Sequence, residues 1–277
     1  MVVRAKEERL DGAGGLRIFV RSWRPATKPK AVVVIVPGFN SHSGQYLWVA
    51  DQLVSEGFAV YAMDLRGRGQ SDGERFYVND ISEYTADVDL AVKLAKSREP
   101  GLQIFIFGHS AGGVTACIYT LDHQPELAGL VCEDFAFQVP APDFAIAALK
   151  GLSHVFPHAH VLKLKNEDFS RDPAAVKLLN QDPLIANETQ PTKTVAALAN
   201  ADDRLKREIP KFTLPVLILH GTMDKVTKLS GSQFFYDNAG SKDKSLKVYE
   251  GHYHDLLNDV GKEGVIADIK AWLNKHV

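Results

Sequence analysis

A serine between two glycines is the first group in this sequence that has the setting for chemistry. Gly108, Ser110 and Gly112 form the pattern G-x-S-x-G, directly after an apolar run at 103–107 and directly before a helix-like stretch at 111–123. A sharp turn from strand to helix needs glycine on either side of the serine, because a side chain there would keep the strand and the helix apart. The pattern predicts that Ser110 is a nucleophile; the alternative is a solvated serine on a glycine-rich turn.

A serine hydroxyl of ordinary pKa needs a base within hydrogen-bond reach, and the base needs an acid that orients it. Asp224 follows an apolar run at 216–219, and His254 follows another at 246–249. Parallel strands end at one edge of their sheet, so these two side chains and Ser110 are expected to meet there. We predict that His254 is the general base and that Asp224 orients it.

Other titratable residues compete for these two roles. His252 lies in the same loop and is the alternative base, and Asp255 and Asp237 are the alternative acids, which we interpret as surface carboxylates. His109 is adjacent in sequence to the serine and is not expected to face it. His220 is expected to be a structural residue at the end of a strand.

Two backbone N–H groups are predicted to form an oxyanion hole, which stabilises the negative charge that develops on the attacked carbonyl. One is the N–H of Ala111, immediately after the nucleophile. The other is the N–H of Phe39, in the loop after the run at 31–36, where Gly38 permits a tight turn and Pro37 has no N–H to donate. The side chains predicted to contact substrate are Asn40, His109, Phe137 and Phe144.

The elements that must position these residues alternate along the chain. The predicted strands are 31–36, 59–63, 103–107, 127–132, 216–219 and 246–249. The predicted helices are 47–56, 81–97, 111–123, 229–238 and 264–276. The second helix has Asp80 as its predicted N-cap, with Glu83 three residues later. Alternating strands and helices predict an α/β fold with a mostly parallel central sheet flanked by helices on both faces.

The alternation is interrupted once, between about residues 135 and 210. A structureless loop of this length is improbable inside a compact domain, so the segment is expected to carry its own helices. We therefore predict a core formed by 1–134 and 211–277 and an inserted helical cap at 135–210. The apolar residues of its first half, 139–164, either offer a surface to substrate or pack onto the core, and its second half, 172–203, is more polar.

Composition limits the kinds of partner. Lysine and arginine number 32 and aspartate and glutamate 34, so the field needed to hold a nucleic acid is absent and a neutral small molecule is expected. The only cysteines, Cys117 and Cys132, are expected to be buried free thiols. The first 16 residues lack the apolar core of a signal peptide, and no apolar run approaches the ~20 residues that span a bilayer. We predict a cytoplasmic protein of undetermined oligomeric state.

Neither a cofactor nor a metal is predicted. The glycine-rich run at 64–73 lacks the Gly-Lys-Ser/Thr ending of a phosphate-binding loop, and we interpret it as a structural turn. His154, His158 and His160 are close in sequence, but Pro157 interrupts helical spacing and no carboxylate or thiol completes a metal site.

Several further motifs make the chain resemble the monoacylglycerol-lipase-like branch of the α/β-hydrolases, a group also described as lysophospholipase-like or serine-aminopeptidase-like. These motifs are Ser43-Gly44-Gln45-Tyr46, the run 64–73, Asp80-Ile81-Ser82-Glu83-Tyr84, the run 108–113, Ser170-Arg171-Asp172-Pro173, Asp182-Pro183-Leu184, the run 220–224 and Tyr253-His254. The resemblance implies an α/β-hydrolase fold whose cap carries a hydrophobic acyl channel. It also favours His254 over His252, because the catalytic histidine of similar proteins follows the aromatic residue.

The resemblance implies a serine carboxylic ester hydrolase that works through an acyl-enzyme on a small-molecule acyl ester. The apolar cap also allows a transient contact with lipid. The family pattern His-Gly-x-Gly-Glu-His-x-x-Arg-Tyr departs here: Ser41 and Gln45 replace the acid and the arginine that would grip a polar headgroup, and Phe39 is bulky where the family has a small residue. The alternatives are a monoacylglycerol lipase proper with a glycerol-specific site, a thioesterase, a peptidase, and a non-catalytic ligand receptor on a hydrolase scaffold.

Overall fold

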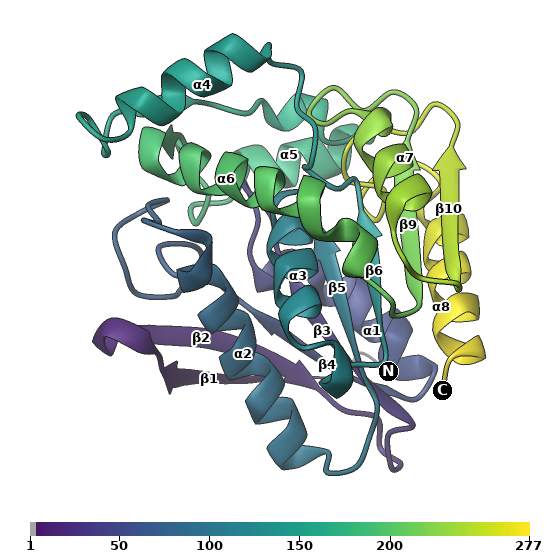
Figure 1. The fold of residues 1–277 in the computed structure, drawn as a ribbon. Coiled ribbons are helices and arrows are strands. Elements are labelled where there is room, and N and C mark those ends of the chain that lie inside the picture. The colour runs from purple at the N-terminus through teal and green to yellow at the C-terminus, as the bar shows by residue number, and fades with distance from the viewer. Residues whose placement is uncertain (1–3) are drawn as a thin grey trace.

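A single eight-stranded sheet runs through the computed structural model, which describes residues 4–277 (Figure 1). In spatial order the strands are β1 (Lys6–Asp11), β2 (Arg17–Trp23), β4 (Phe58–Met63), β3 (Ala31–Val36), β5 (Ile104–His109), β6 (Gly129–Glu133), β9 (Val216–Gly221) and β10 (Lys244–Tyr249). β2 is antiparallel to both of its neighbours, and the strands from β4 to β10 are parallel. The predicted fold class, a mostly parallel sheet flanked by helices, is confirmed.

Helices cover both faces of this sheet. They are α1 (Leu47–Ser55), α2 (Ile81–Arg98), α3 (Ala111–Asp122), α7 (Leu229–Asn238) and α8 (Lys262–Lys275). Alternate residues of β3 enter two different cores: Val32 and Val34 pack with α2 and α3, whereas Val33 and Ile35 pack with α1 and α8. A strand buried on both faces is therefore apolar throughout, which is why its position could be predicted from sequence. The predicted N-cap of α2 is confirmed, since Asp80 accepts a hydrogen bond from the Ser82 N–H at 2.9 Å.

The segment between β6 and β9 contains its own elements, and we call residues 135–210 the insertion. It contains α4 (Asp143–Leu152), β7 (His160–Leu162), α5 (Pro173–Gln181), β8 (Gln190–Pro191) and α6 (Thr192–Glu208). Figure 1 shows α4 and α6 above the end of the sheet at which β5 and β6 finish. β7 and β8 pair antiparallel, a small sheet that the sequence analysis did not predict.

Short 3-10 turns complete the chain: η1 (Ala13–Gly15), η2 (Ser43–Tyr46), η3 (Gln124–Glu126), η4 (Asn166–Asp168) and η5 (Ile209–Lys211). Within residues 4–277 no helix has both the length and the apolar character to cross a bilayer. The prediction about a signal peptide covered the first 16 residues, of which 1–3 lie outside the described part.

A buried arginine joins the insertion to the core. Arg68, on the glycine-rich turn after β4, forms an ion pair with Glu188 of the insertion, and both side chains are almost completely buried. Its guanidinium also donates to Gln190 Oε1 at 2.7 Å and to the Tyr84 hydroxyl at 3.0 Å, and it lies 4.3 Å from the centre of the Phe39 ring. The glycine-rich turn therefore anchors the insertion above the sheet.

Replacing this arginine should destabilise the protein strongly. Arg68→Met is expected to lower the free energy of unfolding by about 3–5 kcal/mol, because it leaves the Glu188 carboxylate buried without its cation. Urea unfolding followed by tryptophan fluorescence measures the change. Arg75→Met is the matched control: Arg75 lies on the same turn but is exposed, and its removal should cost about 1 kcal/mol or less. Equal losses for the two variants would contradict a structural role for the buried pair.

Candidate active site

The predicted nucleophile lies on a strained turn between β5 and α3. Ser110 has φ 55° and ψ −123°, a conformation that residues with side chains rarely adopt. The turn is possible because α3 begins directly against β3: a Cβ atom on Gly112 would lie 2.2 Å from the Val36 carbonyl oxygen. The Ser110 N–H donates to the Glu133 carbonyl on β6 at 2.9 Å. The sequence thus folds locally into a turn that fixes the direction of the Ser110 side chain.

The structure brings the three predicted side chains into one hydrogen-bonded line. His254 Nε2 lies 2.8 Å from Ser110 Oγ, and His254 Nδ1 lies 2.8 Å from Asp224 Oδ2. His254 is fully buried, and it reaches the site on the loop after β10. The loop after β9 supplies Asp224. All three therefore lie at the carboxyl ends of parallel strands, where sheets of this kind place their ligands.

The surroundings of Asp224 favour its ionised form. Burial alone would raise the pKa of this carboxyl, but the charge of His254 and hydrogen bonds from His254 and Thr227 hold the pKa below its usual value. Asp224 Oδ1 accepts from the N–H groups of Val226 at 2.7 Å and Thr227 at 3.0 Å, and Oδ2 is 2.5 Å from the Thr227 hydroxyl. An ionised Asp224 fixes the tautomer in which His254 Nδ1 carries a proton, which leaves Nε2 free to accept one.

The alternative base and acids lie away from the serine. His252 Nδ1 is 3.7 Å from Asp259, and neither residue contacts Ser110. Asp237 is exposed and accepts a hydrogen bond from Gln233, as a surface carboxylate does. The prediction that Asp255 lies on the surface is wrong: its exposed fraction is 7%, because the loop after His254 turns inward over the ends of β5 and β6.

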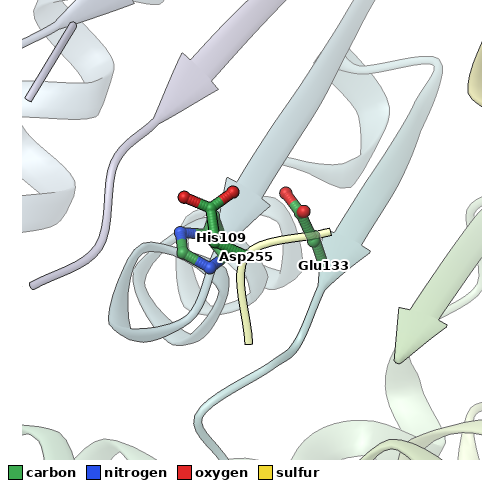
Figure 2. Close-up of side chains that lie close together, drawn as sticks. All are labelled: His109, Glu133 and Asp255. Atoms are coloured by element: carbon green, nitrogen blue, oxygen red, sulfur yellow. The ribbon is translucent and has the colours of Figure 1, made fainter. Parts of the chain in front are cut away.

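Asp255 belongs to a buried group behind His254, and Figure 2 shows it close to His109 and Glu133. One ligand-type atom from each of the three lies within 4.8 Å of the others, a spacing that would also suit a metal ion. Glu133 Oε1 accepts the Leu257 N–H at 3.0 Å, so one of its oxygens already holds the loop that carries the histidine. Burial, with the charge of Asp255 as a smaller cause, raises the pKa of Glu133 well above its usual value.

His109 supports the loop of His254 and does not contact the cavity. Its Nε2 donates to the His254 carbonyl oxygen at 3.1 Å, and burial lowers its pKa to about 4, so the ring is neutral at physiological pH. His220 is likewise buried at the end of β9, where Nδ1 contacts Ser232 Oγ at 2.8 Å and burial lowers the pKa to about 4. His109 and His220 therefore lie near His254 as neutral rings and place no positive charge beside it.

A cavity of about 400 Å³ opens beside the serine. Phe39, Ser110 and Ala111 lie at one part of its wall, and apolar residues of the insertion, including Ile146 and Leu149 of α4, line much of the rest. The loop after β3 lies against the nucleophile turn, since a Cβ atom on Gly38 would be 2.9 Å from Ser110 Cβ and 3.5 Å from the Ala111 nitrogen. The two predicted oxyanion donors thus border the same cavity as the serine hydroxyl.

None of the four predicted substrate contacts lines this cavity. His109 is buried as described, and Phe137 stacks between Phe135 and Phe234 in the core. Phe144 points outward with an exposed fraction of 78%. Asn40 is buried and donates its side-chain amide to Asn166 at 2.8 Å. Sequence proximity to the turn or to the insertion therefore does not fix which way these four side chains point.

The residues that replace the family's headgroup grip also lie outside the cavity. Gln45 donates to the Asn40 carbonyl at 3.3 Å and to Asp182 at 3.4 Å, and it borders a separate hollow between α1 and α5. The three histidines considered for a metal do not converge. His158 contacts Glu74 at 2.7 Å, and His160 Nδ1 contacts the carbonyl and hydroxyl oxygens of Thr189.

A family model described as "Serine aminopeptidase, S33" matches residues 27–261. The chain belongs to this family. The S33 chain is 32% identical to the monoacylglycerol lipase of Mycolicibacterium smegmatis over 98% of both chains. It is 33% identical to the human monoglyceride lipase, over 96% of this chain and 90% of the human one. The crystal structure of Paleococcus ferrophilus monoacylglycerol lipase is similar with a TM-score of 0.85 and 29% identity, over 94% of this chain and 99% of that one.

These comparisons confirm three predictions made from the sequence: the monoacylglycerol-lipase-like family, the α/β-hydrolase fold and the class of enzyme, a serine carboxylic ester hydrolase.

Proposed function

We propose that this S33 hydrolase cleaves acyl esters through an acyl-enzyme in which Ser110 carries the acyl group. The observation that supports this is the unbroken hydrogen-bonded line from Ser110 through His254 to Asp224, at 2.8 Å for each contact. Nucleophile, base and orienting acid stand in the order that acyl transfer to a serine requires.

In the proposed reaction, Ser110 Oγ attacks the ester carbonyl carbon while His254 Nε2 takes the hydroxyl proton. His254 then returns this proton to the leaving alcohol oxygen as the carbon–oxygen bond breaks. Water, deprotonated by the same nitrogen, attacks the acyl-enzyme and releases the acid. Asp224 stabilises the imidazolium in both steps.

The N–H groups of Ala111 and Phe39 are proposed as the oxyanion donors. Both residues border the cavity beside Ser110, and the Gly38 backbone lies in contact with the nucleophile turn. Two contacts fix the position of Phe39. Its ring packs against the Arg68 guanidinium, and the next N–H, that of Asn40, donates to Glu188 at 2.9 Å. Donors fixed before the substrate arrives do not need to reorganise during the reaction.

The acyl group is proposed to occupy the apolar cavity under the insertion, and the alcohol is proposed to lack a dedicated site. Burial of an acyl chain gives roughly 0.8 kcal/mol per methylene. The side chains at the family's headgroup positions, Ser41 and Gln45, do not line the cavity. Binding is therefore expected to depend on the acyl part of the substrate.

The substrate prediction follows directly. We expect kcat/KM to rise with acyl length until the cavity is full, and to change little between a C8 monoacylglycerol and the C8 ethyl ester, because no buried polar group of the enzyme loses a partner when the glycerol is absent. Measuring both esters tests this. A preference for the glycerol ester above about a hundredfold, some 2.7 kcal/mol, would instead favour a monoacylglycerol lipase with a glycerol-specific site.

A panel of substrates tests the reaction class. Carboxylic esters should be turned over faster than acyl-thioesters of equal chain length and far faster than aminoacyl amides. A fluorophosphonate should label Ser110 covalently, and a chain that binds ligands without catalysis would remain unlabelled.

Contact with lipid is proposed for the outer surface of the insertion, where large apolar side chains are exposed: Val139, Phe144, Leu152, Val155, Phe156 and Val161. An apolar surface beside an acyl cavity suits a substrate that partitions into lipid. Phe144→Ser should reduce co-sedimentation with phosphatidylcholine vesicles without changing turnover of a water-soluble ester. Unchanged co-sedimentation would contradict this proposal.

We also propose a cytoplasmic location, which Cys117 and Cys132 support because both are free and buried. Cell fractionation tests it.

A further inference from the structure

The lining of the apolar cavity beside Ser110 includes a carboxyl group. Asp202 lines the cavity from α6, together with Val195, Leu198 and Ala199. These four positions follow the i, i+3, i+4, i+7 spacing of one helix face, so the face that meets the acyl group ends in a carboxyl. Asp202 Oδ1 is buried and has no hydrogen-bond partner among residues 4–277.

The two lysines near Asp202 already have another carboxylate as partner. Lys150 donates to Asp203 at 2.6 Å and to the Ala199 carbonyl at 3.2 Å, and Lys206 lies 3.7 Å from Asp203. Both lysines therefore pair with Asp203, on the outer side of the helix. Inside, burial raises the pKa of Asp202 well above its usual value, although Lys206 and Lys150 oppose the shift.

A carboxyl in this setting favours its neutral form, which has one O–H to donate and oxygens that accept. A plain alkyl chain packed against it leaves these groups unpaired, which costs free energy. A hydroxyl on the acyl chain both donates and accepts, so it satisfies the carboxyl without bringing a charge into the cavity.

Asp202 and the nucleophile lie at different parts of the cavity wall. Ser110 and Ala111 line the cavity at the start of α3, whereas Asp202 lines it from the second half of α6. α6 is in contact with α3, and Figure 1 shows it crossing above that helix. The cavity thus places the carbonyl end of an acyl group at Ser110 and a later part of its chain at Asp202.

We propose that Asp202 determines acyl specificity, so that the cavity selects straight-chain acyl groups carrying a hydroxyl over plain alkyl groups of equal length. The inference rests on the proposed function, because it takes this cavity as the acyl site. The proposal assigns a substrate contact to Asp202, a residue outside all the motifs named from the sequence.

The test uses p-nitrophenyl esters of straight-chain acids with six to twelve carbons, each with and without a terminal hydroxyl, and p-nitrophenyl acetate as a reference. We expect the ratio of kcat/KM for hydroxylated over plain ester to peak at one chain length at about tenfold or more. Asp202→Leu should remove this peak, chiefly by raising kcat/KM for the plain ester about tenfold. Asp203→Leu, the same change one residue later, should keep the peak.

Asp202→Asn keeps groups that donate and accept, so it should retain most of the preference. Acetate is too short to reach Asp202, and its turnover should be equal in the wild type and in Asp203→Leu. A ratio near one at every chain length in the wild type, with acetate turned over normally, overturns the role of Asp202 and leaves the ester hydrolase intact. Loss of the peak in Asp203→Leu as well would also overturn it. Failure of the wild type to turn over acetate overturns the proposed function itself.

Discussion

Ser110→Ala is expected to lower kcat on p-nitrophenyl esters by at least about 10⁴-fold while the protein stays folded. In the proposed reaction this hydroxyl forms the acyl-enzyme, and removing the nucleophile of a serine triad costs up to about 10⁶-fold in kcat. Stability should change little, because Ser110 Oγ makes its hydrogen bond to His254 and contributes little to packing. Steady-state turnover and thermal unfolding measure the two effects.

Fluorophosphonate labelling of the same variant separates loss of the nucleophile from loss of structure. The wild type should be labelled and Ser110→Ala should not, at an unchanged melting temperature. Turnover well above the residual rate that an oxyanion hole alone supplies, or labelling of the alanine variant, would assign the nucleophile to another residue.

His254→Ala should be as damaging to kcat as Ser110→Ala, and Asp224→Asn somewhat less damaging, at about 10⁴-fold. The members of such a line act as a unit, so the double variant Ser110→Ala, His254→Ala should be no worse than either single change. Asparagine keeps the shape of Asp224 but can donate to His254 Nδ1, which favours the tautomer with its proton on Nε2 and blocks acceptance of the serine proton.

His252→Ala is the matched control, since this histidine lies two residues earlier on the same loop and does not contact Ser110. Its loss should change kcat by less than about tenfold. A larger loss for His252→Ala than for His254→Ala would move the base two residues upstream.

The core of the fold could be predicted from sequence where burial dictates composition. β3 reads Ala31–Val36 without a polar residue, because both faces of a central parallel strand are covered. β1 was missed because it lies at the edge of the sheet and is mostly exposed, so its sequence, Lys6–Asp11, is dominated by charges. β2 was missed although it is buried, because Arg17, Arg21 and Ser22 interrupt its apolar residues. The pairing of β7 with β8 was missed for another reason: the strands are two or three residues long, too short to show a period.

The line of Ser110, Asp224 and His254 could be predicted because each follows a strand, and a parallel sheet gathers such positions at one edge. The directions of side chains away from that edge could not be predicted from the sequence. Whether Phe144 or Leu149 of α4 faces the cavity depends on how α4 packs over α6, and Asp202 looks in sequence like one more charge beside Asp203. Asp255 looked exposed for the same reason, since nothing local indicates that its loop turns inward.

The contact between Glu188 and the Asn40 N–H has a consequence for protein engineering. Glu188 belongs to the insertion, but it holds the backbone directly after the proposed oxyanion donor of Phe39, and Arg68 binds it from the core. An insertion transplanted from a relative would bring a new acyl cavity and remove this support from the loop beside Ser110. A chimera built at the natural boundaries should therefore exchange the loop after β3 and the turn carrying Arg68 together with residues 135–210, treating the three segments as one module.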